Sequence, residues 1–488
     1  MGYVFEGLEP KKLWKNFYDL NQIPRESKHE GKVAEWIIDF AKNLGLEVEQ
    51  DEAGNVKVNK PATPGYENAP RICLQGHMDM VCEKNEGVEH DFRKDPIKMK
   101  IEDGFVRAEG TSLGADNGIG VAAGLTVMES DDLVHPPLEF LFTVDEETGL
   151  TGAMALEEGF IEADILINCD SEEDGVFFIG CAGGKNTELN LELETTAADG
   201  NKTALSVKLK GLKGGHSGLD IDKGRANAII QLNRLLWQLD EEFGINLSDI
   251  KGGSAHNAIP REAASVILAD SDNVTAIKEF AADFADNINS EYGGKEADPN
   301  IMVEEVDSPE NVISEESKNA VLNFIYALPN GVIAMSPDIE GLVQTSTNLA
   351  TVKVKDGKLN ILTSQRSSVS SQKDEIAEKV NSVGQLIGAE VVHQGEYPGW
   401  QPNPESPILQ KMKEVYKDLY DVEPGQEAIH AGLETGLIGE KVPGIDMVSF
   451  GPTIHNPHSP DEELEVETVP KFWNVLKETL KRVAEDNK

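Results

Sequence analysis

Hydrophobic and polar positions follow two different periods along the first third of the chain. Residues 11–20 and 29–44 carry apolar side chains at helical spacing, and the second pattern stops at Gly45. Short apolar runs of the kind found in buried strands cover residues 71–75, 138–144 and 164–168, and a Gly-, Ala- and Val-rich helical segment covers 117–128. Strand and helix patterns that alternate in this way predict a mostly parallel sheet with helices on its faces.

The pattern changes near Gly183 and Gly184. Apolar and polar residues then alternate over 189–193 and 204–209, as they do in half-buried antiparallel strands. A helix is expected at 225–239, a strand at 263–269 and a helix at 274–288. A similar series follows, with a helix at 317–328, strands at 341–354 and 358–364, a helix at 373–387 and a strand at 390–393. The repeated order predicts an α+β region with two similar halves, each packing helices on one face of an antiparallel sheet.

The α/β pattern returns after Tyr397, with helical spacing at 407–418 and 470–484 and a short strand at 446–450. We therefore expect the α/β fold class. A domain with a mixed, mostly parallel sheet would comprise residues 1–183 and 401–488, and an inserted α+β domain would comprise residues 184–400. A chain of 488 residues is long enough for two hydrophobic cores.

Composition limits the possible partners. The chain has 87 Asp and Glu against 44 Lys and Arg, a formal net charge of −43, which disfavours nucleic acid and anionic membranes. No apolar run approaches the roughly 18 residues that a membrane span requires. The N-terminal residues show no signal peptide, and the four cysteines lack Cys-x-x-Cys spacing, so we expect a cytoplasmic protein without a disulfide framework.

Candidate chemistry begins with Gly76-His77-Met78-Asp79, directly after the apolar run Ile72-Cys73-Leu74. Residues two apart in a strand point to the same side, so Asp79 can approach the back of the His77 ring. A carboxylate in that position orients a metal-binding imidazole and raises its basicity. Taken alone, the pair is more simply explained as a strand-end histidine beside a solvated aspartate.

Further acidic residues and a histidine lie where predicted elements begin or end. Asp116 precedes a helix, where aspartate is also a common cap. Glu146 and Glu147 follow the run at 138–144, Asp170 follows the run at 164–168, and His458 lies in a proline-flanked loop. Each of these residues alone is typical of a solvated turn.

The joint pattern indicates a metal site. His77, Glu147 and Asp170 all follow predicted parallel strands, and ligands of open α/β sheets bind at the carboxyl ends of such strands. Two histidines and three carboxylates suit Zn²⁺, and also Mn²⁺ or Co²⁺. Five ligands exceed what one catalytic zinc uses, so the set favours two metals with Asp116 as the candidate bridge.

The motifs around these residues resemble those of the co-catalytic dizinc peptidases, a family that includes aminoacylases, carboxypeptidase G2 and bacterial dipeptidases. The resemblance covers essentially the whole chain, and more narrowly the chain resembles cytosolic Xaa-His dipeptidases. Six motifs carry it: Gly76-His77-Met78-Asp79-Met80, Leu113-Gly114-Ala115-Asp116-Asn117-Gly118, Asp145-Glu146-Glu147-Thr148-Gly149, Asn168-Cys169-Asp170, Gly214-Gly215-His216-Ser217-Gly218 and Pro457-His458-Ser459-Pro460.

The resemblance implies roles for the individual residues. One zinc would be bound by His77, Asp116 and Asp170, and the other by Asp116, Glu147 and His458. Asp79 would orient His77, and Glu146 would be the general base. Neighbours in a regular strand face opposite ways, so Glu146 and Glu147 can both reach the metals only if the chain leaves the strand there. His455 remains an alternative to His458 as the ligand.

The resemblance also implies that the inserted domain is a substrate-binding lid. His216 would donate a hydrogen bond to the oxyanion, while Asn257 and Arg366 would hold the substrate carboxylate. His430 and Glu434 resemble pocket residues of the family. Without the resemblance, His216 is an incidental residue in a glycine turn, and Arg366 is as well explained as a surface charge at a strand end.

The expected activity is hydrolysis of Xaa-His and related dipeptides by a water activated between two zinc ions, in a homodimer. A related N-acyl amino acid amidohydrolase is the alternative enzyme. A metal-binding protein without turnover is the alternative outside enzymology, although such a protein would not need Asp79 and Glu146.

Overall fold

The computed structural model describes residues 3–486 and divides into two compact units. Unit 1 consists of Met1–Gly180, Trp400–Ala428 and Leu433–Lys488. Unit 2 consists of Cys181–Gly399 and Ile429–Gly432. The short segment at 429–432 joins the second unit, whereas the sequence patterns had assigned all residues after 400 to the first domain.

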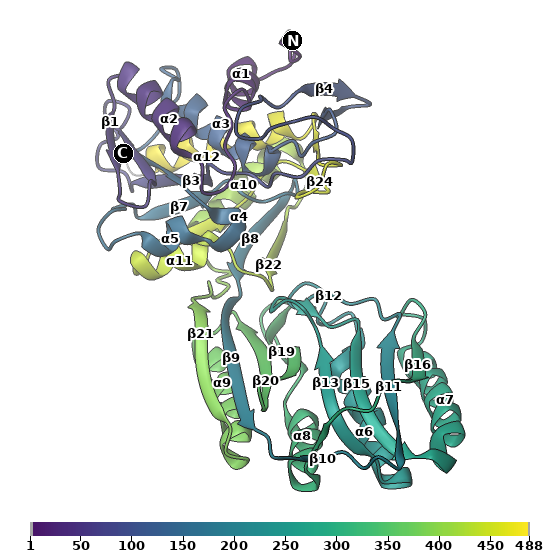
Figure 1. Cartoon of the computed structure of the whole chain (residues 1–488). Coiled ribbons are helices and arrows are strands. Elements are labelled where there is room, and N and C mark those ends of the chain that lie inside the picture. Colours follow the sequence, from purple (N-terminus) through teal and green to yellow (C-terminus); the bar gives the residue numbers. More distant parts are fainter. Residues whose placement is uncertain (1–2, 487–488) are drawn as a thin grey trace. The chain divides into compact units, whose positions relative to one another are not determined.

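Unit 1 is built on an eight-stranded mixed sheet (Figure 1). In spatial order its strands are β1 (Glu47–Gln50), β2 (Val56–Lys60), β6 (Leu138–Thr143), β3 (Ile72–His77), β7 (Ile165–Asn168), β23 (Asp446–Ser449), β8 (Val176–Cys181) and β22 (Gly425–Ile429). The four central strands, β6 to β23, run parallel, and antiparallel pairs flank them. The expected α/β fold with a mixed sheet is confirmed.

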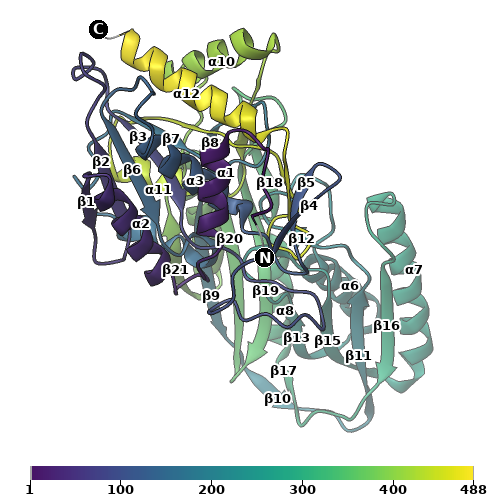
Figure 2. The same cartoon turned by 90° about the horizontal axis from the view of Figure 1, so that it is seen from above.

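Helices lie against this sheet. They are α1 (Lys11–Leu20), α2 (Gly31–Asn43), α3 (Ala115–Met128), α4 (Glu146–Gly149), α5 (Thr151–Ala155), α10 (Pro407–Tyr420), α11 (Glu434–Lys441) and α12 (Val469–Glu485). Helices α10 and α12 lie side by side (Figure 2). A separate small sheet has the order β24 (Ile454–His455), β25 (Glu463–Glu465), β5 (Phe105–Ala108) and β4 (Met99–Glu102).

Helix α3 determines where the unit's polar residues meet. All of its residues are buried, because it packs between β3 and α1 and has no solvent face. Its glycines allow close approach: a Cβ on Gly120 would lie 2.5 Å from the Cys169 carbonyl oxygen. The start of α3 is thereby held against the carboxyl ends of β3 and β7.

Unit 2 contains a continuous nine-stranded sheet. The main path is β16 (Asn300–Glu305), β11 (Lys202–Lys210), β15 (Ala263–Asp270), β13 (Asn246–Gly252), β19 (Val343–Lys355), β20 (Lys358–Ser367), β9 (Gly183–Glu192) and β21 (Glu390–Tyr397), and β18 (Gly331–Met335) also pairs with β19. Strands β13 and β19 join through two residue pairs, Lys251 with Lys353 and Gly252 with Val352. The two expected halves therefore share one sheet through this narrow seam.

Four long helices supply the core of unit 2. They are α6 (Ala228–Phe243), α7 (Val274–Tyr292), α8 (Glu315–Ala327) and α9 (Ser370–Leu386). Their apolar residues pack with alternate strand residues such as Val207, Ile250 and Val352. Smaller elements are the 3₁₀ turn Ser271–Asn273 and the ribbons β10 (Thr195–Ala197) with β17 (Asn311–Ile313) and β12 (Gly215–His216) with β14 (Ala258–Ile259).

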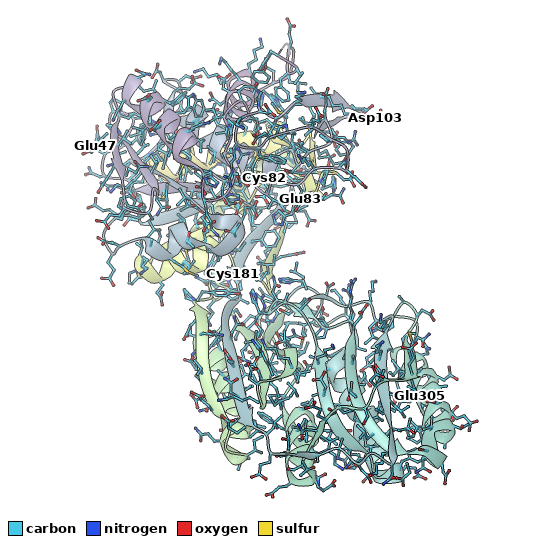
Figure 3. The ribbon with its side chains drawn as sticks, in the orientation of Figure 1. Glu47, Cys82, Glu83, Asp103, Cys181 and Glu305 are labelled. Atoms are coloured by element: carbon cyan, nitrogen blue, oxygen red, sulfur yellow. The ribbon has the colours of Figure 1, made fainter. Side chains whose placement is uncertain are left out.

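Charged residues mark the sheet edges, such as Glu47 on β1 and Glu305 on β16 (Figure 3). Exposed charge on an edge strand opposes pairing with another chain. None of the four cysteines forms a disulfide within residues 3–486, and Cys73 and Cys169 are buried as small core residues. Within residues 3–486, no helix combines the length and apolarity that a membrane span requires.

Candidate active site

Three parallel strands deliver acidic and histidine side chains to one edge of the unit 1 sheet. Strand β3 ends at His77, and β7 is followed two residues later by Asp170. After β6, Asp145 has a left-handed backbone (φ 52°), and the chain turns from the strand into α4 at Glu146. The chain leaves the strand at the point required for the adjacent Glu146 and Glu147 to share a site.

Asp116 lies between two histidines. Its Oδ1 is 3.0 Å from Nε2 of His77, and its Oδ2 is 3.1 Å from Nε2 of His458. Asp116 can reach both because its backbone is not helical (φ −78°, ψ 113°), although it lies in the first turn of α3. One carboxylate thus offers one oxygen to each of two neighbouring groups, which is the geometry of a bridging ligand.

The remaining candidate ligands complete two groups around Asp116. Asp170 Oδ1 is 3.3 Å from Nε2 of His77, and Glu147 Oε2 is 3.0 Å from Nε2 of His458. Within each group the potential ligand atoms lie within 4.8 Å of one another. The structure therefore brings together the two ligand sets that the sequence resemblance implied.

The two candidate histidines of the last loop lie in different places. His458 has a left-handed backbone (φ 59°) that directs its ring to Asp116 and Glu147. His455, on β24, packs its ring edge against Phe105 at 5.9 Å, and its Nε2 is 3.9 Å from Glu465. The geometry favours His458 as the ligand.

Asp79 sits behind His77, with Oδ1 3.3 Å from the ring Nδ1. It also accepts hydrogen bonds from Ser27 Oγ at 2.8 Å and from the backbone N–H groups of Glu146 and Glu147 at 3.1 and 3.2 Å. Burial by itself would raise the Asp79 pKa, but the hydrogen bonds from His77 and Ser27 lower it to about 2. An ionised Asp79 can hold the His77 ring and the start of α4 together.

Other carboxylates at the site have raised pKa values. Burial raises the pKa of Asp170 to about 7 and that of Glu172 to about 8. Burial also raises the pKa of Glu146 well above its usual value, and the negative charges of Asp170 and Glu434 add to the effect. Burial and neighbouring negative charges thus disfavour the ionised form of these three carboxylates.

The donor set fits metal ions. Buried charge is stable only when it is paired or coordinated, and bound divalent cations would supply the missing positive charge. Glu147 Oε1 is buried and has no hydrogen-bond partner within residues 3–486. Imidazole nitrogens mixed with carboxylate oxygens are the ligands that Zn²⁺ accepts and that Mn²⁺ and Co²⁺ also accept.

Two buried residues that the sequence analysis missed hold the Asp116 loop. Glu462 accepts hydrogen bonds from the N–H groups of Leu113 (2.7 Å), Gly114 (2.9 Å), Ala115 (2.7 Å) and Asp116 (3.3 Å). Arg25 donates to the carbonyl oxygens of Met78 (3.1 Å) and Asp79 (2.7 Å), and also to that of Gly114. The sequence carries no signal for Glu462, because Asp461-Glu462-Glu463 is typical of a solvated acidic turn.

Glu434 lies in unit 1 near the carboxylate cluster. Its side chain is buried, and Oε2 accepts hydrogen bonds from Gln75 Nε2 (2.6 Å) and Thr143 Oγ1 (2.7 Å). Burial raises its pKa to about 7. At the start of α11, Glu434 is therefore hydrogen-bonded to β3 and β6 at the edge that carries the candidate ligands.

The other expected substrate-binding residues lie in unit 2. Backbone N–H groups of Gly218 (3.2 Å) and Leu219 (3.0 Å) donate to Nδ1 of His216, so the ring proton sits on Nε2. Burial and the charge of Arg366 lower the His216 pKa to about 4, so the ring is neutral near pH 7. His216 is thus prepared as a neutral donor.

Arg366 is 6% exposed and is held by neighbours within unit 2. It donates from Nε to Ser217 Oγ at 3.4 Å and from Nη1 to Tyr397 Oη at 2.9 Å. The same segment is tied to Asn257, whose carbonyl accepts from Ser217 N at 2.8 Å. Burial lowers the His430 pKa to about 3, and its Nε2 is 2.7 Å from Ser346 Oγ.

We expect Glu462→Gln to lower the free energy of unfolding by roughly 1–3 kcal/mol, because an amide nitrogen cannot accept the loop's buried N–H groups. Chemical denaturation measures the change. Glu463→Gln is the control: its carboxylate pairs with Arg107 at a partly exposed position, so its effect should stay below about 1 kcal/mol. Equal effects of the two variants would show that Glu462 does not hold the loop.

Comparisons with known proteins identify the family of the chain. Residues 73–482 match peptidase family M20/M25/M40. The chain is 42% identical over 476 residues, 98% of each chain, to a protein of Escherichia coli K12 named cytosol non-specific dipeptidase. It superimposes with a TM-score of 0.90 and 40% identity, over 98% of each chain, on the aminoacylhistidine dipeptidase of Vibrio alginolyticus. The aminopeptidase PepT of Bacillus cereus shares the fold, with a TM-score of 0.57 and 18% identity.

Proposed function

Because this chain belongs to peptidase family M20/M25/M40, we propose that it is a dipeptidase that uses two metal ions bound around Asp116. The observation that carries the proposal is the shared carboxylate, whose two oxygens lie 3.0 and 3.1 Å from two different histidines. The names of the E. coli and V. alginolyticus relatives support dipeptides as the substrate class.

The proposed ligands divide into two sets. His77, Asp116 and Asp170 would hold one ion, and Asp116, Glu147 and His458 would hold the other. We propose Zn²⁺ as the resident metal, with Mn²⁺ and Co²⁺ as substitutes, because the set mixes nitrogen and oxygen donors. When bound, the ions supply Lewis acidity that activates water and polarises the peptide carbonyl.

Glu146 is the proposed general base. A carboxylate oxygen of Glu146 lies within 4.8 Å of ligand atoms of His77 and Glu147, which places it beside the ligands. Burial and the surrounding carboxylates raise its pKa, so the side chain can both accept a proton from the attacking water and return it to the leaving amine. Asp79, through its contact with His77 Nδ1, is proposed to orient that ligand.

Glu146→Gln should reduce kcat for dipeptides by roughly 10²–10⁴-fold, because the proton acceptor is removed. Metal content, measured after dialysis and resupply of zinc, should stay at the wild-type level. Glu157→Gln, an exposed acid in the same unit, is the matched control and should keep full activity. A Glu146→Gln enzyme as fast as the wild type would reject Glu146 as the general base, whereas metal-loaded wild-type protein that hydrolyses no dipeptide would favour a metal-binding protein without turnover.

The assignment of His458 is tested by metal content. His458→Asn should lose the ion held with Glu147, because asparagine tolerates the left-handed backbone but does not replace the imidazole. His455→Asn is the matched variant and should retain both ions, as measured by equilibrium dialysis and elemental analysis. Loss of metal from His455→Asn alone would show that the ligand is misplaced.

Unit 2 is proposed to recognise the substrate. Its neutral His216 would donate from Nε2 to the developing oxyanion, a contribution that is typically worth about 3 kcal/mol. Arg366, with Asn257, would hold the C-terminal carboxylate, since a guanidinium binds a carboxylate through two parallel hydrogen bonds. Glu434 and His430 are proposed pocket residues, and contacts to both ends of a short peptide would select dipeptides by orientation.

We expect Arg366→Lys to raise KM for a dipeptide roughly 10–100-fold with a smaller change in kcat, because a charged hydrogen-bonded contact is lost. Replacing the C-terminal carboxylate of the dipeptide by an amide should raise KM by a similar factor for the wild type. The same replacement should not raise KM further for the Arg366→Lys variant. Arg234→Lys, whose arginine pairs with Glu291 in the same unit, should behave like the wild type. A further loss with the amide in the variant would contradict the assignment.

Several finer points belong to the same proposal. The names of the relatives support Xaa-His among the accepted dipeptides and the cytoplasm as the location. A homodimer is proposed from the family resemblance and is checked by light scattering. An N-acetylated dipeptide hydrolysed as fast as the free one would instead favour an N-acyl amino acid amidohydrolase.

A further inference from the structure

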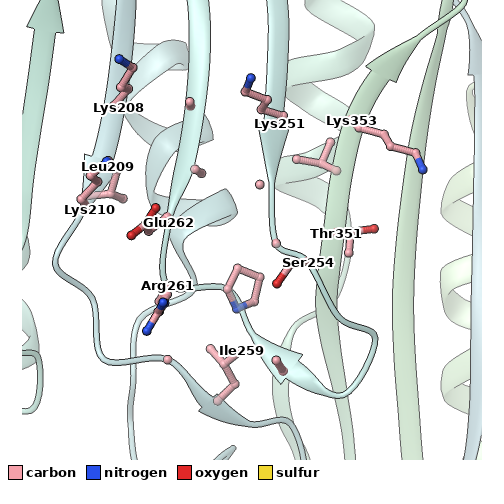
Figure 4. A pocket seen from close by; sticks show the side chains of 18 of the residues that line it. Lys208, Leu209, Lys210, Lys251, Ser254, Ile259, Arg261, Glu262, Thr351 and Lys353 are labelled. Carbon is pink, nitrogen blue, oxygen red and sulfur yellow. The ribbon is translucent and has the colours of Figure 1, made fainter. Parts of the chain in front are cut away.

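A hollow on the unit 2 sheet carries positive charge in a strongly acidic protein. Its volume is about 840 Å³, and its lining includes parts of β11, β13, β15 and β19 (Figure 4). Six cationic side chains line it, Lys208, Lys210, Lys213, Lys251, Arg261 and Lys353, against one acidic side chain, Glu262. The whole chain has a formal charge of −43, so this local reversal of sign is notable.

Three of the lysines form one row across the sheet. Lys208 on β11 pairs with Ala264 on β15, Ala264 pairs with Lys251 on β13, and Lys251 pairs with Lys353 on β19. Residues paired in this way point to the same face of a sheet. That face is opposite the helices, because the alternate residues Val207, Ile250 and Val352 belong to the core beneath.

The row places like charges at the seam between β13 and β19, which only two residue pairs join. Lys251 and Lys353 are directly opposite each other and form one of the two residue pairs that join β13 to β19. Like charges at directly opposite positions destabilise a sheet. A bound anion between these ammonium groups would remove the repulsion and stabilise the seam.

Protein carboxylates leave most of this charge without a partner. Lys208 pairs with Glu304 at 3.3 Å, and the charge of Lys251 acts on Asp249, but Lys210, Lys213 and Lys353 form no ion pair within residues 3–486. The acidic composition offers many possible partners, and the hollow nonetheless excludes nearly all of them. Ala264, which lies between Lys208 and Lys251 in the row, is small and leaves space between the lysine stems.

We infer that this hollow binds a small anion with two phosphate groups. Neighbouring strands lie about 4.8 Å apart, so one phosphate can sit between Lys251 and Lys353, and a second can reach Lys208 at roughly 10 Å. Each phosphate carries about −1.5 to −2 charges at pH 7, which matches the local excess of positive charge. Lysine ammonium groups bind phosphate as point charges.

The hollow is distinct from the metal ligands, which all belong to unit 1. Part of its lining is Gly215 of β12 and Ala258 and Ile259 of β14, the ribbon that carries His216. An occupied hollow would therefore order the sheet next to a proposed substrate-binding residue. The inference does not require the proposed dipeptidase activity, since binding and stability are measured directly.

Calorimetric titration of the metal-loaded full chain with fructose 1,6-bisphosphate, fructose 6-phosphate and fructose tests the site. The bisphosphate should bind at least 10-fold more tightly than the monophosphate, and fructose should not bind. The affinity for the bisphosphate should fall when salt is raised from 20 to 200 mM, because the site is exposed to solvent. The bisphosphate should also raise the melting temperature of the protein.

Lys251→Gln with Lys353→Gln should weaken bisphosphate binding at least 10-fold and abolish the thermal shift, while the unliganded melting temperature stays equal or rises. Lys358→Gln with Lys379→Gln removes two exposed charges elsewhere in unit 2 and should bind within twofold of the wild type. Lys208→Gln alone is the second variant, expected to bring the bisphosphate affinity towards that of the monophosphate.

Three results would overturn the inference. Unchanged bisphosphate affinity in both the double variant and Lys208→Gln would show that binding occurs elsewhere, including at the metals. An equal loss in the Lys358 and Lys379 control would show diffuse attraction rather than a site. Tighter binding of a tetraglutamate peptide than of the bisphosphate would show that the face accepts an acidic protein segment.

Discussion

The carboxylate of Asp116 is the contact on which the candidate active site depends. Its two oxygens approach His77 and His458, which are 381 positions apart in the sequence (458 − 77), and so join two ligand groups into one centre. A single carboxylate can do this only if its backbone leaves the helical conformation in the first turn of α3. Several buried contacts of unit 1 hold that turn in place.

The Asp116 turn is held by the packing of α3 and by the hydrogen bonds of two buried charged residues. Helix α3 packs on β3, and its Gly120 and Gly124 lie close to Cys169 after β7 and Phe142 of β6, so the turn cannot move without disturbing the core. Glu462 accepts four backbone N–H groups of the turn, and Arg25 links the turn to the segment after His77. The site is therefore positioned by buried, charged hydrogen bonds, which cost much when one partner is lost.

Charge is divided between the two units in a way that suits the proposed chemistry. Unit 1 collects buried carboxylates, which suit cations, and burial together with the neighbouring negative charges raises the pKa values of Glu146 and Asp170. Unit 2 collects Arg366 and the neutral histidines His216 and His430, which suit a substrate carboxylate and a developing oxyanion. The lysine row on the open face of the unit 2 sheet shows the same preference for anions.

Long elements with strong periodicity were predictable, among them α1, α10 and α12, because burial of one face imposes a helical spacing on their apolar residues. Short and exposed strands were missed. Strand β1, with the sequence Glu-Val-Glu-Gln, has mostly exposed residues, and a strand at a sheet edge needs little hydrophobic pattern. The continuous sheet of unit 2 was also missed, because the apolar pattern of a strand does not indicate which other strand it pairs with.

The sequence by itself determined the chemistry of the site: the residue types, and their places directly after strands whose carboxyl ends share one edge. Only the tertiary structure decided which of His455 and His458 meets Asp116, that Glu462 holds the Asp116 turn, and that three lysines from separate strands form a row. The physical reason is the same in each case. These relations depend on hydrogen bonds and strand register between residues far apart in the chain, which local periodicity does not encode.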